Sequence, residues 1–127
     1  MQQFIIFSVF RKEDSYSVNF NNDAVTRCKL ESEGIKFAVL DGSYGNVHES
    51  SLLVDARHEN RVIEIAKVFQ QESILFVDKT RRAFLVYLAD NRTVQLKGRF
   101  QGVDRDVAIK QDSFSRNVVN NKYYAVV

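Results

Sequence analysis

The fold that we predict depends most on residues 57–77, RHENRVIEIAKVFQQESILFV. Over Arg57–Gln70 the apolar residues recur at intervals of three and four positions, and charged residues occupy the opposite side. This spacing is typical of an amphipathic helix. The apolar run Ser73–Val77 then predicts a buried strand directly after the helix.

The chain before this helix predicts a strand, a second helix and a hairpin. Phe4–Phe10 is aromatic and β-branched with one polar residue, which is typical of a buried strand. Asn22 or Asp23 is a suitable N-cap for a helix, and Gly34 suits the left-handed cap at its end. The hairpin consists of the strands Ile35–Leu40 and Val47–Val54, joined by the turn DGSYGN.

The chain after residue 77 predicts further strands, which are Ala83–Leu88, Thr93–Phe100 and an edge strand from the tail KYYAVV. In order, the first four strands and two helices run β-α-β-β-α-β, which is the ferredoxin-like arrangement. We therefore predict an α+β fold, with both helices on one face of an antiparallel sheet and extra C-terminal strands. Residues 1–127 are expected to form a single domain, because this length is within the usual domain size.

The other face of this sheet predicts self-association. Two helices cover only one face, so about half of the apolar residues of the sheet lack cover within the chain. An exposed apolar sheet face usually marks an interface. We expect a closed homo-oligomer, for instance three sheets packed around a threefold axis.

Composition and charge exclude several classes of protein. The chain has 18 basic and 16 acidic residues, and its net charge of +2 is too small for a phosphate-binding face, so no nucleic-acid partner is expected. No apolar stretch approaches the roughly 20 residues that cross a bilayer, and the N-terminus lacks signal-peptide features. We therefore expect a cytoplasmic protein with no membrane contact.

The motifs of metal sites and of nucleophilic catalysis are absent from the sequence. His48 and His58 are the only histidines, and Cys28 lies far from both along the chain. Zinc sites require three or four ligands, so no metal site is predicted, and Cys28 is expected to be structural. The chain also lacks the G-x-S-x-G, G-x-G-x-x-G and Walker-type runs, and no cofactor is expected.

Two polar groups at predicted turns remain as candidate binding residues. Tyr44 lies in the predicted hairpin turn and Glu49 five residues later in the next strand, where a phenol and a carboxylate can meet to receive a cationic or polyhydroxylated ligand. The second group is the amide and carboxylate cluster Gln70, Gln71 and Glu72, at the helix-to-strand junction. For both groups, ordinary surface side chains are the commoner alternative.

Several sequence blocks, in this order and spacing, resemble the small phage-encoded S-adenosylmethionine lyases, formerly described as hydrolases. The resemblance covers roughly residues 4–103. Its blocks are FSVFR (7–11), GSY (42–44), Glu49 with SSLLV (50–54), QQESILFV (70–77), AFLVY (83–87) and LKGRFQGV (96–103).

The resemblance implies a PII-like fold and a homotrimer with active sites between subunits. Members of this family cleave S-adenosylmethionine to 5′-methylthioadenosine and homoserine lactone, which removes the cofactor of host restriction and methylation. The catalytic tyrosine and glutamate of the family fall on Tyr44 and Glu49. Its nucleotide-contacting amide and acid fall on Gln71 and Glu72.

The chemistry that the resemblance implies needs no metal, cofactor or protein nucleophile, because the substrate's carboxylate attacks its own Cγ and expels a neutral thioether. Arg11, at the end of the first strand, is a candidate partner for that carboxylate, and a solvated arginine is its commoner alternative. Two other functions stay open. One is a non-catalytic PII-like trimer that binds an adenine nucleotide or similar metabolite, and the other is a phage inhibitor that binds a host protein.

Overall fold

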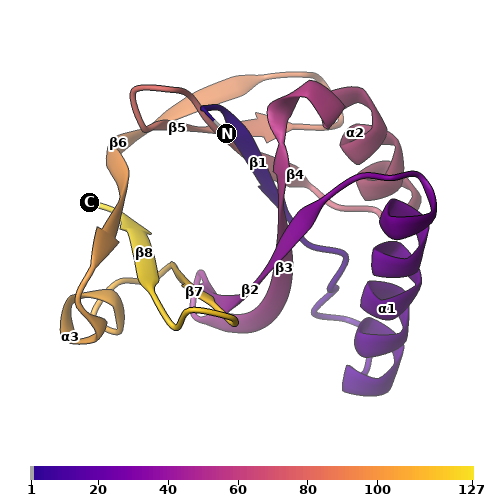
Figure 1. Ribbon diagram of the computed structural model, residues 1–127, viewed down its shortest axis with the longest axis horizontal. Helices are drawn as coiled ribbons and strands as arrows, with labels where there is room; N and C mark the ends of the chain where they lie inside the picture. Colours follow the sequence, from indigo (N-terminus) through magenta and orange to yellow (C-terminus); the bar gives the residue numbers. More distant parts are fainter. Residues whose placement is uncertain (1) are drawn as a thin grey trace.

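The computed structural model describes residues 2–127, and its strands close into a single antiparallel barrel (Figure 1). Around the barrel the strands follow the order β1-β3-β2-β7-β8-β6-β5-β4, and β4 pairs with β1 to complete the circle. The strands are β1 (Phe4–Phe7), β2 (Phe37–Tyr44), β3 (Val47–Asp55), β4 (Ser73–Val77), β5 (Arg82–Tyr87), β6 (Thr93–Val103), β7 (Phe114–Asn117) and β8 (Tyr123–Val126).

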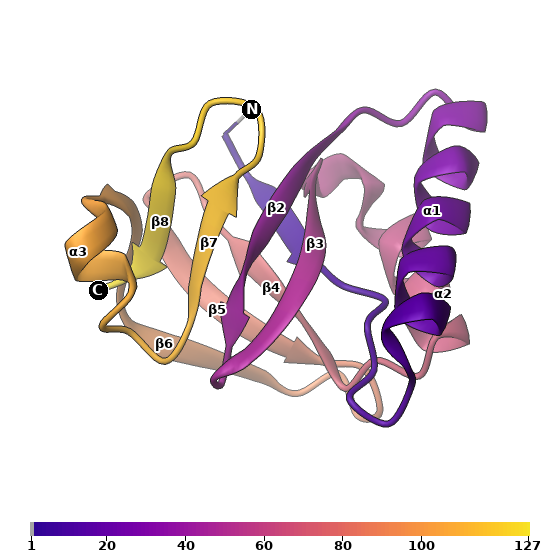
Figure 2. The ribbon, with the colours of Figure 1, turned by 90° about the horizontal axis from the view of Figure 1, so that it is seen from below.

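Two long helices lie side by side against one wall of the barrel, as both ribbon views show (Figures 1 and 2). The helices are α1 (Tyr16–Ser32) and α2 (Glu59–Val68), with a single 3-10 turn η1 (Ala56–His58) before α2 and a short α3 (Arg105–Ala108) near the C-terminus. No helix within residues 2–127 has the length and apolar character needed to span a membrane.

Helix α1 begins at Tyr16, earlier than the predicted start at Asn22 or Asp23. Its N-cap is Ser15, whose hydroxyl accepts a hydrogen bond from the Val18 backbone N–H at 3.3 Å. Asp23 instead faces the protein interior and forms an ion pair with Arg27 at 2.6 Å, one helical turn later. The predicted end is confirmed, because the residue after the cap, Gly34, has a positive φ of 71°.

Strand β1 is buried on both of its faces, which explains why its sequence has no apolar–polar alternation. Ile5 and Phe7 pack in a core between the barrel wall and the helices, together with Leu30 of α1 and Val62 of α2. We call this cluster the helix-side core. The alternate residues of β1 belong to a second cluster that includes Leu40, Val77, Ala83 and Phe100, which we call the barrel-interior cluster.

The predicted ferredoxin-like or PII-like fold is wrong, because the sheet is a closed barrel of eight strands. The succession β-α-β-β-α-β is present over β1 to β4, and both long helices lie on one side. The sheet does not end at β4 and β2, however. Strand β5 pairs with β4, strand β7 pairs with β2, and β6 and β8 join the two.

The C-terminal residues close the barrel in a way that their sequence does not indicate. The tail strand β8 pairs with both β6 and β7, so it is an interior strand and not the predicted edge strand. Strand β7 was not predicted, since FSRN is short and mostly polar. Closure of the barrel covers the apolar sheet face from which a homo-oligomer was predicted. That face therefore no longer supports the prediction of a trimer.

Candidate active site

A cavity of about 590 Å³ lies inside the barrel and is open to solvent over part of its boundary. All eight strands contribute residues to its lining, as do the segments Gln71 and Gln111–Ser113. This volume lies within the range that is usual for pockets that hold a small molecule. The barrel interior is therefore the candidate binding site.

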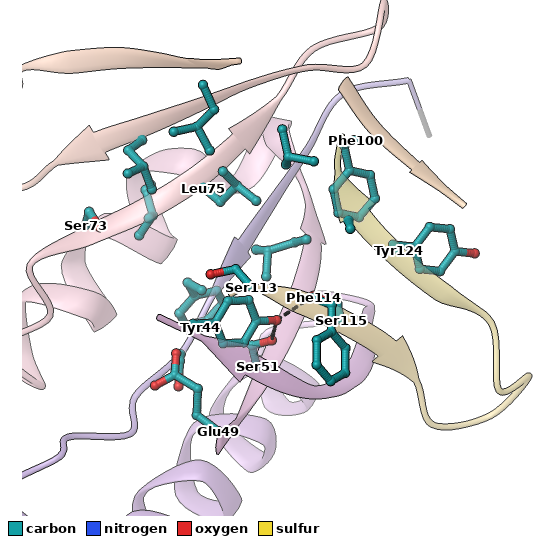
Figure 3. Close-up of a pocket in the computed structure, with 18 of the residues that line it drawn as sticks. Tyr44, Glu49, Ser51, Ser73, Leu75, Phe100, Ser113, Phe114, Ser115 and Tyr124 are labelled. Carbon is teal, nitrogen blue, oxygen red and sulfur yellow. Dashed lines mark hydrogen bonds between the residues drawn. The ribbon is translucent and has the colours of Figure 1, made fainter. Parts of the chain in front are cut away.

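The lining of the cavity divides into an apolar part and a polar part. Leu75, Phe100 and Tyr124 belong to the apolar part, and the hydroxyl groups of Tyr44, Ser51 and Ser115 meet in the polar part (Figure 3). The carboxyl of Glu49 lies beside the Tyr44 ring. The arrangement suits a ligand with an aromatic or apolar portion and a charged, hydrogen-bonding end.

The β2–β3 hairpin brings the two predicted site residues together. Its turn contains Gly45 and Asn46, both with positive φ, as tight two-residue hairpins require. Glu49 lies directly opposite Gly42 in the register, where no side chain stands in its way. The predicted meeting of Tyr44 and Glu49 at one place is therefore present, within the barrel cavity.

Tyr44 is held by hydroxyl groups from the strands on either side of β2. Its phenolic oxygen lies 2.9 Å from Ser51 Oγ on β3 and 2.5 Å from Ser115 Oγ on β7. Burial raises the pKa of the Tyr44 phenol above its ordinary value of 10.0, although both serine hydrogen bonds lower it. The phenol is therefore neutral at physiological pH and retains its proton.

Glu49 is a carboxylate in a poorly hydrated position without a compensating charge. Burial alone raises the pKa of its carboxyl from 4.5 to about 7, and no cation of residues 2–127 contributes to the shift. An opposite charge nearby would lower the pKa again. A cationic ligand in the cavity would supply that charge, so Glu49 is the natural partner for a positive group of the ligand.

The other predicted site residues lie in different environments. Gln71 lines the cavity, and its side-chain amide donates a hydrogen bond to the Phe10 carbonyl at 2.9 Å. Glu72 is exposed and outside the cavity lining, where its backbone carbonyl accepts from Leu88.

Arg11 also lies outside the cavity lining. Its guanidinium pairs with Glu13 at 2.7 Å and reaches Asp14 at 3.9 Å. Its backbone exchanges hydrogen bonds with the Asn19 side chain, which connects the β1–α1 loop to the helix. The structure thus brings Tyr44, Glu49 and Gln71 to one cavity. The other candidates, Gln70, Glu72 and Arg11, lie outside its lining.

Several polar residues of the cavity lining were not predicted, among them Ser51, Ser115 and Lys97. Ser51 has a weak signal, since it is the polar residue directly before the apolar run Leu52–Val54. Ser115 has none, because its strand is itself absent from the predicted elements. Lys97 lies beside Gly98 in β6, in the stretch where the β5–β6 register shifts.

The described part of the chain holds no group of three or more His, Cys, Asp or Glu side chains placed to bind a metal ion. His48 forms a pair with Asp41 at 2.6 Å, and it does not line the cavity. Cys28 is exposed on α1 and does not line the cavity.

One comparison with known proteins finds a match over almost the whole chain. The family model described as the S-Adenosylmethionine lyase family matches residues 5–127. The match extends past residue 103, where the resemblance seen in the sequence ends, and so includes β7 and β8. No curated protein matches the chain.

Proposed function

Because the chain belongs to the S-adenosylmethionine lyase family, we propose that its barrel cavity binds S-adenosylmethionine and cleaves the bond between the sulfonium and Cγ of the methionyl arm. The expected products are 5′-methylthioadenosine and homoserine lactone. Tyr44 and Glu49 are the proposed catalytic residues, and Gln71 is proposed to bind substrate.

The single observation that carries this proposal is the uncompensated carboxyl of Glu49 in the polar part of a largely apolar cavity. S-adenosylmethionine has a sulfonium and an ammonium group, and either one would compensate the charge of Glu49. Its adenine ring matches the apolar part of the lining, which includes Leu75 and Phe100.

The proposed reaction needs only a folded substrate. A carboxylate oxygen of the methionyl arm attacks Cγ and forms a five-membered lactone, while the Cγ–S bond breaks and its electron pair remains on sulfur. The sulfonium becomes a neutral thioether, and no proton has to be transferred. Holding the arm in this near-attack conformation can lower a barrier by about 7–11 kcal/mol in favourable cases.

The cavity contributes by holding the substrate's charged groups apart from water. The reaction merges a carboxylate and a sulfonium into neutral groups, so water stabilises the starting state more than the transition state. Glu49 is directed at the ammonium, because a carboxylate next to the attacking carboxylate would repel it. The neutral Tyr44 hydroxyl is directed at the carboxylate, where it can orient this group.

The rival function as a binder of an adenine nucleotide is less compatible with the cavity. Nucleotide phosphates are anionic, whereas the charged groups of the lining are two carboxylates, Glu49 and Asp112, and one cation, Lys97. Like charges of ligand and site disfavour binding. The PII-like fold on which this rival depended is also not observed.

The resemblance implies finer points that stay predictions. These are a phage origin with a role against host restriction, a cytoplasmic location, and a homotrimer with sites between subunits. The roles of Glu72 and Arg11 in substrate binding stay predictions as well, and their positions outside the cavity lining give them no support. The solution mass, measured by light scattering, would distinguish a trimer from a single subunit.

The proposal is tested by incubating the purified protein with S-adenosylmethionine and following 5′-methylthioadenosine by chromatography. We expect turnover in the wild-type protein and a fall in kcat/KM of about a hundredfold in Glu49→Gln, since removing one partner of a buried charge pair typically costs about 2–5 kcal/mol. Glu31→Gln, on the exposed face of α1, is the matched control and should keep full activity. Intact substrate after prolonged incubation with the wild-type protein would contradict the proposal.

A further inference from the structure

Three hydroxyl groups from three neighbouring strands meet inside the cavity. They belong to Tyr44 on β2, Ser51 on β3 and Ser115 on β7, and we call them the hydroxyl triad (Figure 3). Both serines are almost fully buried, at 1% and 3% exposure. The inference below deepens the proposed function and rests on it.

The hydroxyl triad has one more proton than its own hydrogen bonds can use. Each of its three hydroxyl groups has one proton, and each of its two hydrogen bonds uses one. The three groups make no other side-chain hydrogen bond with residues 2–127. A buried donor without an acceptor costs about 1–3 kcal/mol, so the third proton favours an acceptor that enters the cavity.

The position of the free proton follows from the acidity of the three groups. A phenol is a stronger acid than the alcohol of serine, and it is therefore the better donor to an anionic acceptor. Both serines then donate to the Tyr44 oxygen, and each of these bonds strengthens the phenol as a donor.

We propose that Ser51 and Ser115 both donate hydrogen bonds to the phenolic oxygen of Tyr44, and that the hydroxyl triad thereby directs a single proton at the carboxylate of the substrate. Tyr44 touches the substrate in this arrangement. Ser51 and Ser115 are positioning residues, which act through Tyr44. The site consequently recognises the α-amino-acid end of the substrate by two groups, the triad for the carboxylate and Glu49 for the ammonium.

A neutral donor suits this position better than an arginine. The substrate's carboxylate is the nucleophile, and a bidentate guanidinium would hold its electron pairs in a charge-assisted contact. A single phenolic hydrogen bond orients the carboxylate and leaves its second oxygen free to attack Cγ. The location of Arg11 outside the cavity lining is consistent with this division of roles.

The test uses decarboxylated S-adenosylmethionine, which keeps the sulfonium and the ammonium but has no carboxylate. Calorimetry measures the affinity of the protein for this compound. Initial rates of S-adenosylmethionine cleavage give kcat and KM. We expect Ser51→Ala and Ser115→Ala each to lower kcat/KM about five- to tenfold, since each removes one hydrogen bond that orients the phenol. The affinity for the decarboxylated compound should change less than twofold. Glu49→Gln should weaken the binding of both compounds.

A double-mutant cycle separates positioning from a general loss of packing. Tyr44→Phe should lower kcat/KM by more than either serine variant, and adding Ser115→Ala to it should have little further effect. Ser43→Ala, on β2 next to Tyr44 but outside the cavity lining, is the matched control. Additive losses in the cycle, or equal weakening of both compounds by the serine variants, would overturn the inference.

A substrate-free readout distinguishes failure of the inference from failure of the proposed function. Titration of phenolate absorbance, with Tyr44→Phe used to identify the signal, should show a higher Tyr44 pKa in Ser115→Ala than in the wild-type protein. An unchanged pKa would overturn the donation by serine. Wild-type protein that binds neither compound overturns the proposed function and the carboxylate assignment, whatever the titration shows.

Discussion

The two faces of β1 bury similar apolar side chains but serve different purposes. Ile5 faces the helix-side core, where α1 and α2 provide side chains that fill the space between helix and barrel. Ile6 faces the barrel interior, where no further element enters and a cavity remains. A packed face and a hollow face on one strand show that apolar character alone does not determine whether a protein surface becomes core or site.

The barrel interior also contains polar groups that lack partners within the protein. On the interior side the structure holds a half-buried carboxyl without a cation and a buried hydroxyl proton without an acceptor. Such groups lower the stability of the folded state unless a ligand compensates them. We therefore expect the helix-side core to stabilise the fold. The polar groups of the barrel interior should lower the free energy of unfolding and favour the binding of a ligand.

The largest effect is expected from a substitution in the helix-side core. Leu30 of α1 is fully buried there, and Leu30→Ala removes buried methyl groups and leaves a cavity, at a cost of about 4 kcal/mol in the free energy of unfolding. Val25→Ala, on the same helix but 53% exposed, should change it by less than about 0.5 kcal/mol. Urea denaturation measures both values. A strongly lowered kcat of folded Leu30→Ala protein would refute the proposal that the helix-side core stabilises the fold and the barrel interior binds the substrate.

The next effect tests the seam that closes the barrel between β2 and β7. A Cβ at Gly42 would overlap the backbone carbonyl of Phe114, so Gly42→Ala has to push these strands apart. We expect a loss of about 3 kcal/mol in stability together with a loss of activity, since Ser115 lies opposite Gly42 on β7.

Gly102→Ala is the control for this substitution. Its Cβ would meet nothing closer than 3.9 Å, and its φ is not positive, so it should be nearly neutral. Thermal unfolding and the turnover assay report both effects. A Gly42→Ala protein with wild-type stability would show that the closed barrel is not the folded state in solution.

The smallest of these effects is a gain in stability at the proposed site. The pKa of Glu49 is about 7 in the folded protein against an ordinary 4.5, so its contribution to stability is fully present below pH 4.5 and is lost as the pH rises through 7. Glu49→Gln should therefore be more stable than the wild-type protein by about 2 kcal/mol at pH 8, after allowance for solvent screening. At pH 4 the two proteins should unfold alike.

Activity should move in the opposite direction over the same pH range. The ionised form of Glu49 binds the cationic substrate, so kcat/KM of the wild-type protein should rise as the pH increases toward 7 and then level off. Chemical denaturation and initial rates at matched pH values compare the two trends. A wild-type stability that is independent of pH between 4 and 8, relative to Glu49→Gln, would argue against a buried carboxyl.

Most elements of the first part of the chain follow from local patterns. The predicted strand Ser73–Val77 has the observed bounds, and the predicted helix Arg57–Gln70 contains the observed α2, Glu59–Val68. The start of α1 was predicted too late, because Ser15 is a cap without an apolar stripe after it. Several of the apolar residues of this helix are exposed, including Phe20 and Val25.

The candidate site was predictable only where its residues belong to one hairpin. Tyr44 and Glu49 flank one turn, and the pairing of β2 with β3 brings them to the same face without help from the rest of the chain. Ser115 is far away in sequence, and it reaches Tyr44 only through the pairing of β7 with β2. No periodicity in the sequence of β7 indicates that pairing.

The sequence by itself determined the positions of the hairpin and the amphipathic helix, because residue spacing reflects the geometry of a helix or strand over a few turns. Only the tertiary structure decided that the sheet closes and that a cavity remains inside it. The physical reason is that closure depends on backbone hydrogen bonds between strands far apart in the chain, and these bonds involve no particular side chains. Closure adds the Ser115 hydroxyl of β7 to the Tyr44, Ser51 and Glu49 groups that the β2–β3 hairpin already brings together.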